Sequence, residues 1–222
     1  MTQETSGTDV STDGSSNNTM RPNPSDTKDV ARWRKAERER LITARLALSV
    51  SERQDHAHAV SRDLDKIVTA KPEAIVSVYW PFRGEPDLRP WMTAACEKGM
   101  RVALPIVVAK EQPLIFREWR PGARLEHGVW NIPFPADGDP VTPTVVIAPL
   151  VGFDPNAYRL GYGGGFFDRT LSSLKREPIA IGVGHPIGAI ETIHPQTFDI
   201  PMDWIVTGHT TPCRRVETGP AS

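Results

Sequence analysis

Four of the five residues at 161–165 are glycine, and this run constrains the chain more than any other feature. A β-branched run at 145–147, typical of a buried parallel strand, precedes it, and apolar residues with helical spacing follow it at 167–174. Glycine lets a ligand approach the backbone closely, and the first amides of a helix attract anions. Because Arg159 adds a planar, fixed positive charge just before the glycines, the segment predicts a site for phosphate or another oxyanion.

Two well-known phosphate loops do not fit this segment. No Gly-Lys-Ser/Thr follows the glycines, as it would in a P-loop. The run also lies late in the chain, without the acidic residue that is expected in a dinucleotide-binding unit. A tight bend that binds nothing is the alternative interpretation of a glycine run. Arg159 before the run and Asp168 after it favour the oxyanion site.

The composition limits the class of protein. With 222 residues the chain suits one domain with a single core, and its formal net charge of −1 argues against broad nucleic-acid binding. The sequence has no run of about twenty apolar residues and no apolar signal core, so we expect neither a membrane span nor secretion. The histidines lack zinc-site spacing, and the distant Cys96 and Cys213 favour free thiols. We therefore expect a cytoplasmic monomer that binds small molecules, without nucleic-acid or membrane partners.

The pattern along the chain predicts one α/β domain. Residues 1–29 are too polar to bury a core and predict a disordered tail. After them, helices are expected at 30–48, 49–68 and 86–96, and strands at 74–79, 102–107, 114–119, 145–147, 179–183 and up to 206. This rhythm predicts a single three-layer, Rossmann-like domain over 30–210 with a mostly parallel sheet, followed by a tail at 211–222. Ligands are expected at the carboxyl ends of its strands.

The helix expected at 30–48 carries two stripes. The apolar stripe consists of Trp33, Leu41, Ala44 and Leu48, and it predicts the buried face. A basic stripe lies beside it, in which Arg34 and Arg38 are four residues apart and point the same way, and Arg45 follows seven residues later. This stripe is either a solvated basic face or a face that binds phosphate.

A rigid loop is predicted at 130–135, which reads Trp-Asn-Ile-Pro-Phe-Pro. Its Trp130 suits stacking on a flat ring ligand, although a buried tryptophan that anchors a loop is the alternative. No Ser/His/Asp or Cys/His arrangement for covalent catalysis is evident in the sequence. Phosphoryl transfer needs mainly positioning, positive charge and magnesium, for which glycine amides, arginines and isolated aspartates are suitable.

The string Phe-Asp-x4-Arg-Leu-Gly-x-Gly-x-Gly-Phe-Phe-Asp-Arg, which begins at Phe153, resembles the signature of the 5-formyltetrahydrofolate cyclo-ligase family. This family is also called methenyltetrahydrofolate synthetase. Weaker matches extend the resemblance over residues 32–207. They include the basic positions of the first helix and a Trp-Asn-Ile-Pro segment that is similar to the one in animal members. Shared architecture also makes the fold similar to that of sugar-phosphate isomerases and CoA transferases.

The resemblance implies an enzyme that uses ATP and Mg²⁺ to cyclise 5-formyltetrahydrofolate to 5,10-methenyltetrahydrofolate, with release of ADP and phosphate. It implies that Arg159 offsets charge on the transferred phosphoryl group. The implied ATP-binding residues are Arg34 or Lys35, Arg38, Arg159, Leu160, Gly161, Tyr162, Gly163, Gly164, Gly165, Phe166 and Phe167. The implied folate-binding residues are Trp80, Glu85, Trp130, Tyr162, Gly163, Gly164, Gly165 and Phe166. The implied Mg²⁺ ligands are Asp168 and Asp199.

A simpler role is open for several of these residues. Glu85 could be an exposed loop acid, and Asp168 a first-turn acid that the helix dipole favours. Asp199 could be a turn residue, and Trp80 could belong only to the core.

Phe167 is a departure from the family pattern, because members usually have tyrosine at this position and often at Phe166. The missing hydroxyls leave two other functions open. One is a folate binder without ATP turnover. The other is an enzyme of the same architecture that acts on sugar phosphates or CoA esters, which would leave Glu85 and the loop at 130–135 unexplained.

Overall fold

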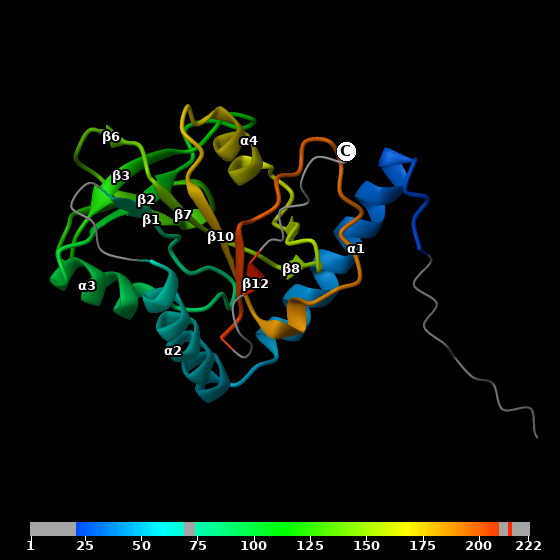
Figure 1. The fold of residues 1–222 in the computed structure, drawn as a ribbon, viewed down its shortest axis with the longest axis horizontal. Helices are drawn as coiled ribbons and strands as arrows, with labels where there is room; N and C mark the ends of the chain where they lie inside the picture. The colour runs from blue at the N-terminus through cyan, green and yellow to red at the C-terminus, as the bar shows by residue number, and fades with distance from the viewer. Residues whose placement is uncertain (1–20, 69–73, 209–212, 215–222) are drawn as a thin grey trace, which may run out of the picture.

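The computed structural model describes residues 21–68, 74–208 and 213–214, and Figure 1 shows their arrangement. The helices are α1 (Thr27–Leu46), α2 (Val50–Ile67), α3 (Arg89–Glu97) and α4 (Phe166–Ser173), with short 3-10 helices η1 (Val129–Asn131) and η2 (Pro186–Gly188). The main sheet contains β1 (Ile75–Ser77), β2 (Arg101–Ile106), β3 (Ile115–Trp119), β6 (Pro140–Val141), β7 (Val145–Pro149), β10 (Ile179–Val183), β11 (Trp204–Val206) and β12 (Cys213–Arg214). Two small pairs join β4 (Leu125–His127) to β5 (Pro133–Pro135) and β8 (Gly152–Phe153) to β9 (Arg159–Leu160).

The eight-stranded sheet is mostly parallel, as predicted. Its order is β12-β11-β10-β7-β1-β2-β3-β6, and the five central strands from β11 to β2 are parallel. Both edges of the sheet are antiparallel. On one edge β3 and β6 run against their neighbours, and on the other edge β12 does so. From β1 the chain builds the sheet toward β2, and from β7 it builds in the other direction toward β10. The gap between β1 and β7 is therefore the topological switch point, where ligands bind in open α/β sheets.

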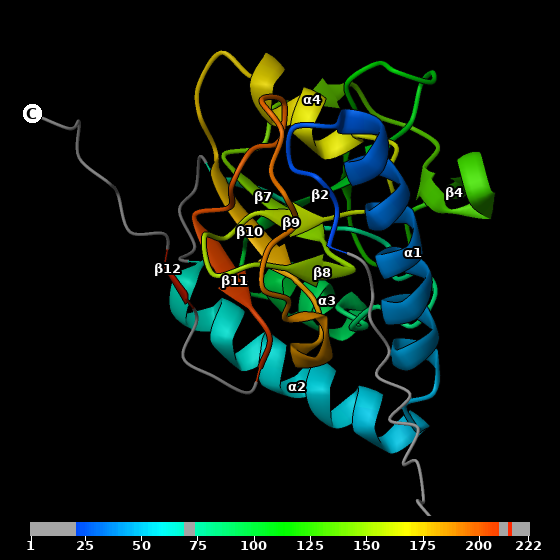
Figure 2. The same ribbon diagram turned by 90° about the vertical axis from the view of Figure 1, so that its right-hand side faces the viewer.

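Helices cover both faces of the sheet. Val60 and Leu64 of α2 and Trp91 and Met92 of α3 pack on one face. Leu171 of α4 packs on the other face in a separate cluster with strands β7 and β10. Figures 1 and 2 show α2 and α3 on one side of the sheet and α4 on the opposite side, with α1 running along the edge of these layers. The predicted three-layer architecture is confirmed.

The capping box that predicted the second helix is present. Ser49 Oγ accepts from the Glu52 amide, and the Glu52 carboxylate accepts from the Ser49 amide, so α2 begins where expected. The helix predicted at 86–96 is displaced by a few residues, since α3 places Pro90 in its first turn and begins at Arg89. No described helix combines the length and the apolarity that a membrane crossing requires.

The prediction for α1 is wrong in its buried face. The helix runs from Thr27 to Leu46 rather than over 30–48, because the Asp26 carboxylate caps the amides of Lys28 and Asp29. Its buried residues are Val30, Arg34, Glu37, Leu41 and Arg45, whereas Ala44 of the predicted stripe is exposed and Trp33 and Leu48 are half-buried. Three of the five buried side chains are charged, so this helix meets the domain largely through polar contacts. Residues 1–20 of the predicted tail lie outside the described residues.

The order strand, glycine loop, helix also needs a correction. A hairpin formed by β8 and β9 lies between β7 and the glycines, and it places Arg159 on a strand. At Gly152 a Cβ atom would meet Leu41 Cδ1 at 2.8 Å, so glycine lets α1 approach the hairpin closely. The hairpin thereby brings α1 and the glycine loop together.

A pair of buried histidines joins α2 to the loop after β10. The rings of His56 and His185 stack with centroids 4.1 Å apart, and His185 Nε2 lies 3.0 Å from Gly84 O. Burial, followed by the neighbouring positive charges, lowers the pKa of His185 from 6.5 to about 4. As the pH falls below 6.5, His185 therefore binds a proton in the unfolded chain but not in the folded chain. The free energy of unfolding decreases until the pH reaches about 4.

We expect acid to destabilise the protein through this pair. Between pH 7 and pH 4.5 the His185 contribution to the free energy of unfolding falls by about 2–3 kcal/mol at most, at 1.36 kcal/mol per pKa unit. Urea unfolding of the wild type and of His185→Gln measures this contribution, because glutamine can still donate to Gly84 O but does not titrate. Equal pH dependence of the two proteins would rule out the histidine as a source of acid sensitivity.

Candidate functional site

A cavity of about 190 Å³ lies at the carboxyl ends of the central strands. Tyr79 and Trp80 follow β1, Ile106 ends β2, and Pro149 ends β7, and all four residues line the cavity. The cavity therefore occupies the switch point of the sheet. Every residue predicted for the site lines it except Lys35, which is exposed on α1.

The glycine loop forms one wall of this cavity. Gly163 has φ of 91° and Gly165, the residue before α4, has φ of 64°, which favour glycine over residues with a side chain. A Cβ atom at Gly163 would lie only 3.2 Å from Arg38 Cζ. Glycine at this position thus allows the guanidinium to rest directly on the loop.

Arg38 is bound to the glycine loop through only one of its nitrogens, so the others can bind a ligand. Its Nε donates to Gly161 O over 2.6 Å, whereas Nη1 and Nη2 have no hydrogen-bond partner in the described part of the chain. Burial, followed by the positive charge of Arg34, lowers the pKa of Arg38. Arg38 is half-buried, and a guanidinium with unused donors beside another cation is a favourable place for an anion.

Arg34 is buried but already bound. Its guanidinium donates to Asp199 Oδ1 and Oδ2 over 3.2 and 2.5 Å, and also to the carbonyls of Ile193 and His194. It therefore ties α1 to the segment at 193–199. Lys35 is exposed and does not line the cavity, so Arg34 is the one of the two residues that lies at the cavity.

Arg159 and Asp168 form a second pair. Arg159 Nη1 and Nη2 each lie 3.0 Å from one oxygen of Asp168, and the guanidinium lies 5.7 Å from the centroid of the Phe167 ring. The Arg159 side chain is 4% exposed, and its Nε has no partner among the described residues. Arg159 faces the cavity rather than bulk water, but much of its charge is offset by Asp168.

Asp168 and Asp199, the predicted Mg²⁺ ligands, supply only some of the ligands that a metal ion needs. Each of Asp168 and Asp199 accepts two hydrogen bonds from an arginine, and no group of three or more metal-ligating side chains is present among residues 21–68, 74–208 and 213–214. Mg²⁺ is usually held by one or two carboxylates together with substrate phosphates and water. The residues present fit that mode and do not fit a site built from protein ligands alone.

Glu85 lines the cavity and is only 6% exposed, so the alternative of an exposed loop acid is wrong. Its Oε2 accepts from the Phe82 amide over 2.8 Å, and its Oε1 is buried without a partner at hydrogen-bond geometry among the described residues. The Tyr162 hydroxyl is near enough to Glu85 to lower its pKa, but this hydroxyl lies 3.4 Å from Phe82 O and also accepts from Arg45. Burial raises the pKa of Glu85 to about 7, and the positive charge of Arg45 opposes this shift. An unsatisfied buried carboxylate oxygen at a cavity is a strong acceptor for a ligand N–H group.

Aromatic rings complete the cavity. Trp130 and Asn131 have φ of 57° and 59°, a costly conformation for residues with a side chain, and Trp130 is 52% exposed. The Trp130 ring lies 6.5 Å from Phe82 in a stacked arrangement and 6.3 Å from Phe166 edge-on. The loop at 130–135 is therefore not anchored by a buried tryptophan. Trp80 is half-buried, lines the cavity and also packs against the core, so it does not belong to the core alone.

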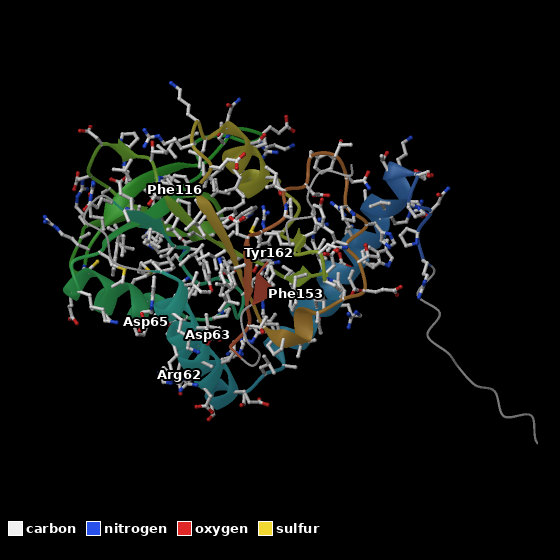
Figure 3. All side chains as sticks on the ribbon, in the orientation of Figure 1. Arg62, Asp63, Asp65, Phe116, Phe153 and Tyr162 are labelled. Carbon is white, nitrogen blue, oxygen red and sulfur yellow. The ribbon has the colours of Figure 1, made fainter. Side chains whose placement is uncertain are left out.

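Sequence reasoning missed three residues near the cavity. Phe198 is 66% exposed and lines the cavity next to Asp199, and Phe82 lies opposite Trp130. No periodic signal marks these loop residues. Arg45 was noted only as part of a basic stripe, but it lies eleven residues after Arg34, which is about three helical turns, and so faces the same side. Figure 3 shows Tyr162, which contacts Arg45, between the sheet and α1.

The model of the 5-formyltetrahydrofolate cyclo-ligase family matches residues 30–208. The chain belongs to this family. A relative named 5-formyltetrahydrofolate cyclo-ligase from Escherichia coli strain K12 is 35% identical over 141 residues, which cover 60% of this chain and 76% of the relative. One of the same name from Haemophilus influenzae is 23% identical over 173 residues, which cover 74% and 91% of the two chains.

Solved structures agree with the family assignment. The NMR structure of Aquifex aeolicus 5,10-methenyltetrahydrofolate synthetase superposes with a TM-score of 0.71 at 28% identity, over 85% of this chain and 95% of that one. A 5,10-methenyltetrahydrofolate synthetase from Mycoplasma pneumoniae has a TM-score of 0.66 at 22% identity, over 79% and 99% of the two chains, and shows the shared fold. The resemblance found in the sequence, and the fold inferred with it, are confirmed.

Proposed function

We propose that this protein is a 5-formyltetrahydrofolate cyclo-ligase that uses ATP and Mg²⁺ and releases ADP and phosphate. One observation carries the proposal beyond family membership. A single cavity has an unsatisfied buried carboxylate oxygen, Glu85 Oε1, and an available guanidinium, Arg38, with the glycine loop as a shared wall. One group suits the N–H donors of a pterin, and the other suits a phosphate.

Glu85 would hold the pterin ring. Its free oxygen can accept from ring N–H and amino groups, which come in adjacent pairs on a pterin. Trp80, Phe82 and Trp130 supply flat apolar surfaces around it, and such surfaces favour stacking of a conjugated ring. The strained backbone at Trp130 supports a binding role for that loop, because such conformations cluster at ligand sites.

Arg38 and the amides at 163–166 would hold the triphosphate. The amides at the start of α4 have no helical partners, and the helix dipole favours an anion there. Arg159 lies at the same wall and would lower the energy of the charge that develops on the transferred phosphoryl group. Asp168 and Asp199 would take Mg²⁺, which neutralises phosphate charge when bound.

In this reaction the residues of the protein orient the two substrates and form no covalent bond with them. In the reaction implied by the family, the formyl oxygen of the substrate attacks the γ-phosphorus and ADP leaves. N10 then closes the ring and phosphate departs. Glu85 and the aromatic wall would orient the formyl group, and the glycine loop and Arg38 would orient the phosphorus.

Mixing the purified protein with 5-formyltetrahydrofolate and MgATP tests the proposal. The near-ultraviolet absorbance of the methenyl product is expected to rise, and omission of ATP or Mg²⁺ is expected to abolish the rise. A fresh, folded preparation that yields no product would disprove the proposal.

The competing function of folate binding without turnover is motivated by Phe166 and Phe167. The structure gives both rings apolar partners, since Phe167 packs beside Leu171 and Phe166 contacts Trp130. Calorimetry with each ligand separates the two functions. A protein that binds the folate but neither binds ATP nor forms product would support the competing function.

We expect Arg38→Ala to raise the KM for ATP. The loss of hydrogen bonds between a guanidinium and a phosphate costs about 1.5–3 kcal/mol, or a factor of about 10 to 100. The matched control is Arg32→Ala, which removes an arginine from the same helix. Its side chain is 77% exposed and pairs with Asp29 alone among the described residues. An unchanged KM for ATP in Arg38→Ala, or an equal rise in the control, would show that Arg38 does not bind the triphosphate.

A further inference from the structure

The loop that carries Glu85 is held by side chains from three distant elements. Tyr162 Oη lies 3.4 Å from Phe82 O, Arg45 Nε donates to Arg83 O over 2.9 Å, and His185 Nε2 lies 3.0 Å from Gly84 O. Three consecutive carbonyls are thus bound from the glycine loop, from α1 and from the segment after β10.

This loop needs such support. Arg83 and Gly84 have φ of 47° and 76°, and a residue with a side chain, such as Arg83, adopts such values only where its surroundings enforce them. Glu85 follows directly, so the direction of its free Oε1 depends on how these two residues are held.

Arg45 makes the most extensive of the three contacts. It is 3% exposed, and besides Arg83 O its guanidinium donates to Tyr162 Oη over 2.6 Å and reaches Leu150 O at 3.4 Å. One side chain thereby links α1, the Glu85 loop, the end of β7 and the glycine loop.

Arg45 is also the positive charge that acts on Glu85. Glu85 has no ion-pair partner among the described residues, and Arg45 exerts the largest opposing electrostatic effect on its ionisation. Three other titratable groups near it, Tyr79, Tyr162 and His185, are neutral at pH 7, whereas Arg83 in the same loop carries a charge. Burial raises the pKa of both Tyr79 and Tyr162, and it lowers the pKa of His185. Asp87, the nearest acid along the chain, is paired with Arg89.

We propose that Arg45 is a positioning residue of this enzyme, which fixes the Glu85 loop against the glycine loop and favours the charged form of the Glu85 carboxylate for its ligand. The folate part of this inference rests on the proposed function. The effect of Arg45 on Glu85 is a property of the free protein and can be tested without any ligand.

The test is a double-mutant cycle of Arg45→Gln and Glu85→Gln, with urea unfolding measured from pH 5 to pH 9. With Arg45 in place, the stability difference between the wild type and Glu85→Gln changes until the pH passes about 7, where Glu85 ionises. Loss of an adjacent opposite charge shifts such a midpoint by about one to three pH units. We expect the midpoint to move up by at least that lower value in the Arg45→Gln background. Equal midpoints would overturn the proposal.

Two further variants separate charge from contact. Arg45→Lys keeps the charge and is expected to leave the midpoint near that of the wild type, whereas a midpoint equal to that of Arg45→Gln would contradict the proposal. Arg117→Gln is the matched control, because Arg117 is half-buried and also donates to two backbone carbonyls, those of Pro135 and Ala136. It is expected to cause no shift, and a shift as large as that of Arg45→Gln would count against the proposal.

Arg45→Gln could also lose its fold outright, and the cycle covers that outcome. If the uncompensated Glu85 charge is the cause, adding Glu85→Gln restores cooperative unfolding, which supports the proposal. Failure of the double variant to fold would overturn it.

The same variants address the folate by calorimetry with 5-formyltetrahydrofolate. Arg45→Gln is expected to weaken binding at least tenfold at pH 7, with partial recovery toward pH 9 as Glu85 ionises, and binding unchanged at every pH would overturn the positioning role. A shifted midpoint in the unfolding cycle, together with a wild type that does not bind the folate, would overturn the proposed function and leave the link between Arg45 and Glu85 intact.

Discussion

Replacing Arg159 by alanine is expected to lower kcat by a factor of about 30 to 1,000, which corresponds to the 2–4 kcal/mol that one preorganised donor supplies. The guanidinium is buried at the cavity wall, and a water molecule that fills the space left by alanine would carry no positive charge. The same change removes the partner of Asp168 and leaves a mostly buried carboxylate uncompensated. Loss of one member of a buried pair costs about 3–5 kcal/mol, so the variant is also expected to be less stable.

A second variant separates these two losses. Arg159→Ala combined with Asp168→Asn removes the stranded charge and is expected to recover most of the stability but none of the turnover. Asp168→Asn alone measures how much turnover is lost with this proposed Mg²⁺ ligand. The methenyl absorbance assay and urea unfolding measure the two quantities on the same preparations. If the double variant regains activity together with stability, Arg159 is a structural residue and its catalytic assignment is wrong.

Replacing Glu85 by glutamine is expected to make the protein more stable and a weaker folate binder. Since burial raises the pKa of Glu85 from 4.5 to about 7, the unfolded chain loses its proton at lower pH than the folded chain. Stability therefore falls as the pH rises from 4.5 to 7 and stays low above that. The substitution removes this penalty, which is up to about 3 kcal/mol at 1.36 kcal/mol per pKa unit.

The folate is expected to bind about 10 to 100 times more weakly to this variant, because hydrogen bonds to a charged acceptor contribute about 1.5–3 kcal/mol. Urea unfolding at pH 5 and pH 8 and calorimetry at pH 8 measure the two effects. Glu97→Gln on α3 is the control, since this glutamate is exposed and no gain in stability is expected from it. If the Glu85 variant is less stable than the wild type at pH 8, the ionised Glu85 carboxylate does not destabilise the folded protein, and this prediction is wrong.

The fold and most of the cavity could be predicted because their signals are local. Each of these signals lies within a few residues and predicts the local structure there. They are the capping box of α2, the β-branched strands and the glycine run. The motif that begins at Phe153 then placed residues from separate loops in one site, and all but Lys35 line the cavity.

The face of α1 could not be predicted in this way. Hydrophobic periodicity assumes that burial follows apolarity, but Arg34 and Arg45 are buried because Asp199, Tyr162 and backbone carbonyls of distant loops satisfy them. Such partners become visible only in the tertiary structure. The pairing of Asp168 with Arg159 was missed for the same reason, although both residues had been assigned separately.

The Arg34–Asp199 contact spans 165 positions of the chain, and this has a consequence for biosynthesis. A ribosome extends a protein from its amino end, so α1 emerges long before the aspartate that neutralises it. Until then its cationic side has no permanent counterpart, and early docking would strand a charge away from water. The catalytic cavity should therefore close only after nearly all of the polypeptide has been made, and fragments that stop before residue 199 should remain without activity.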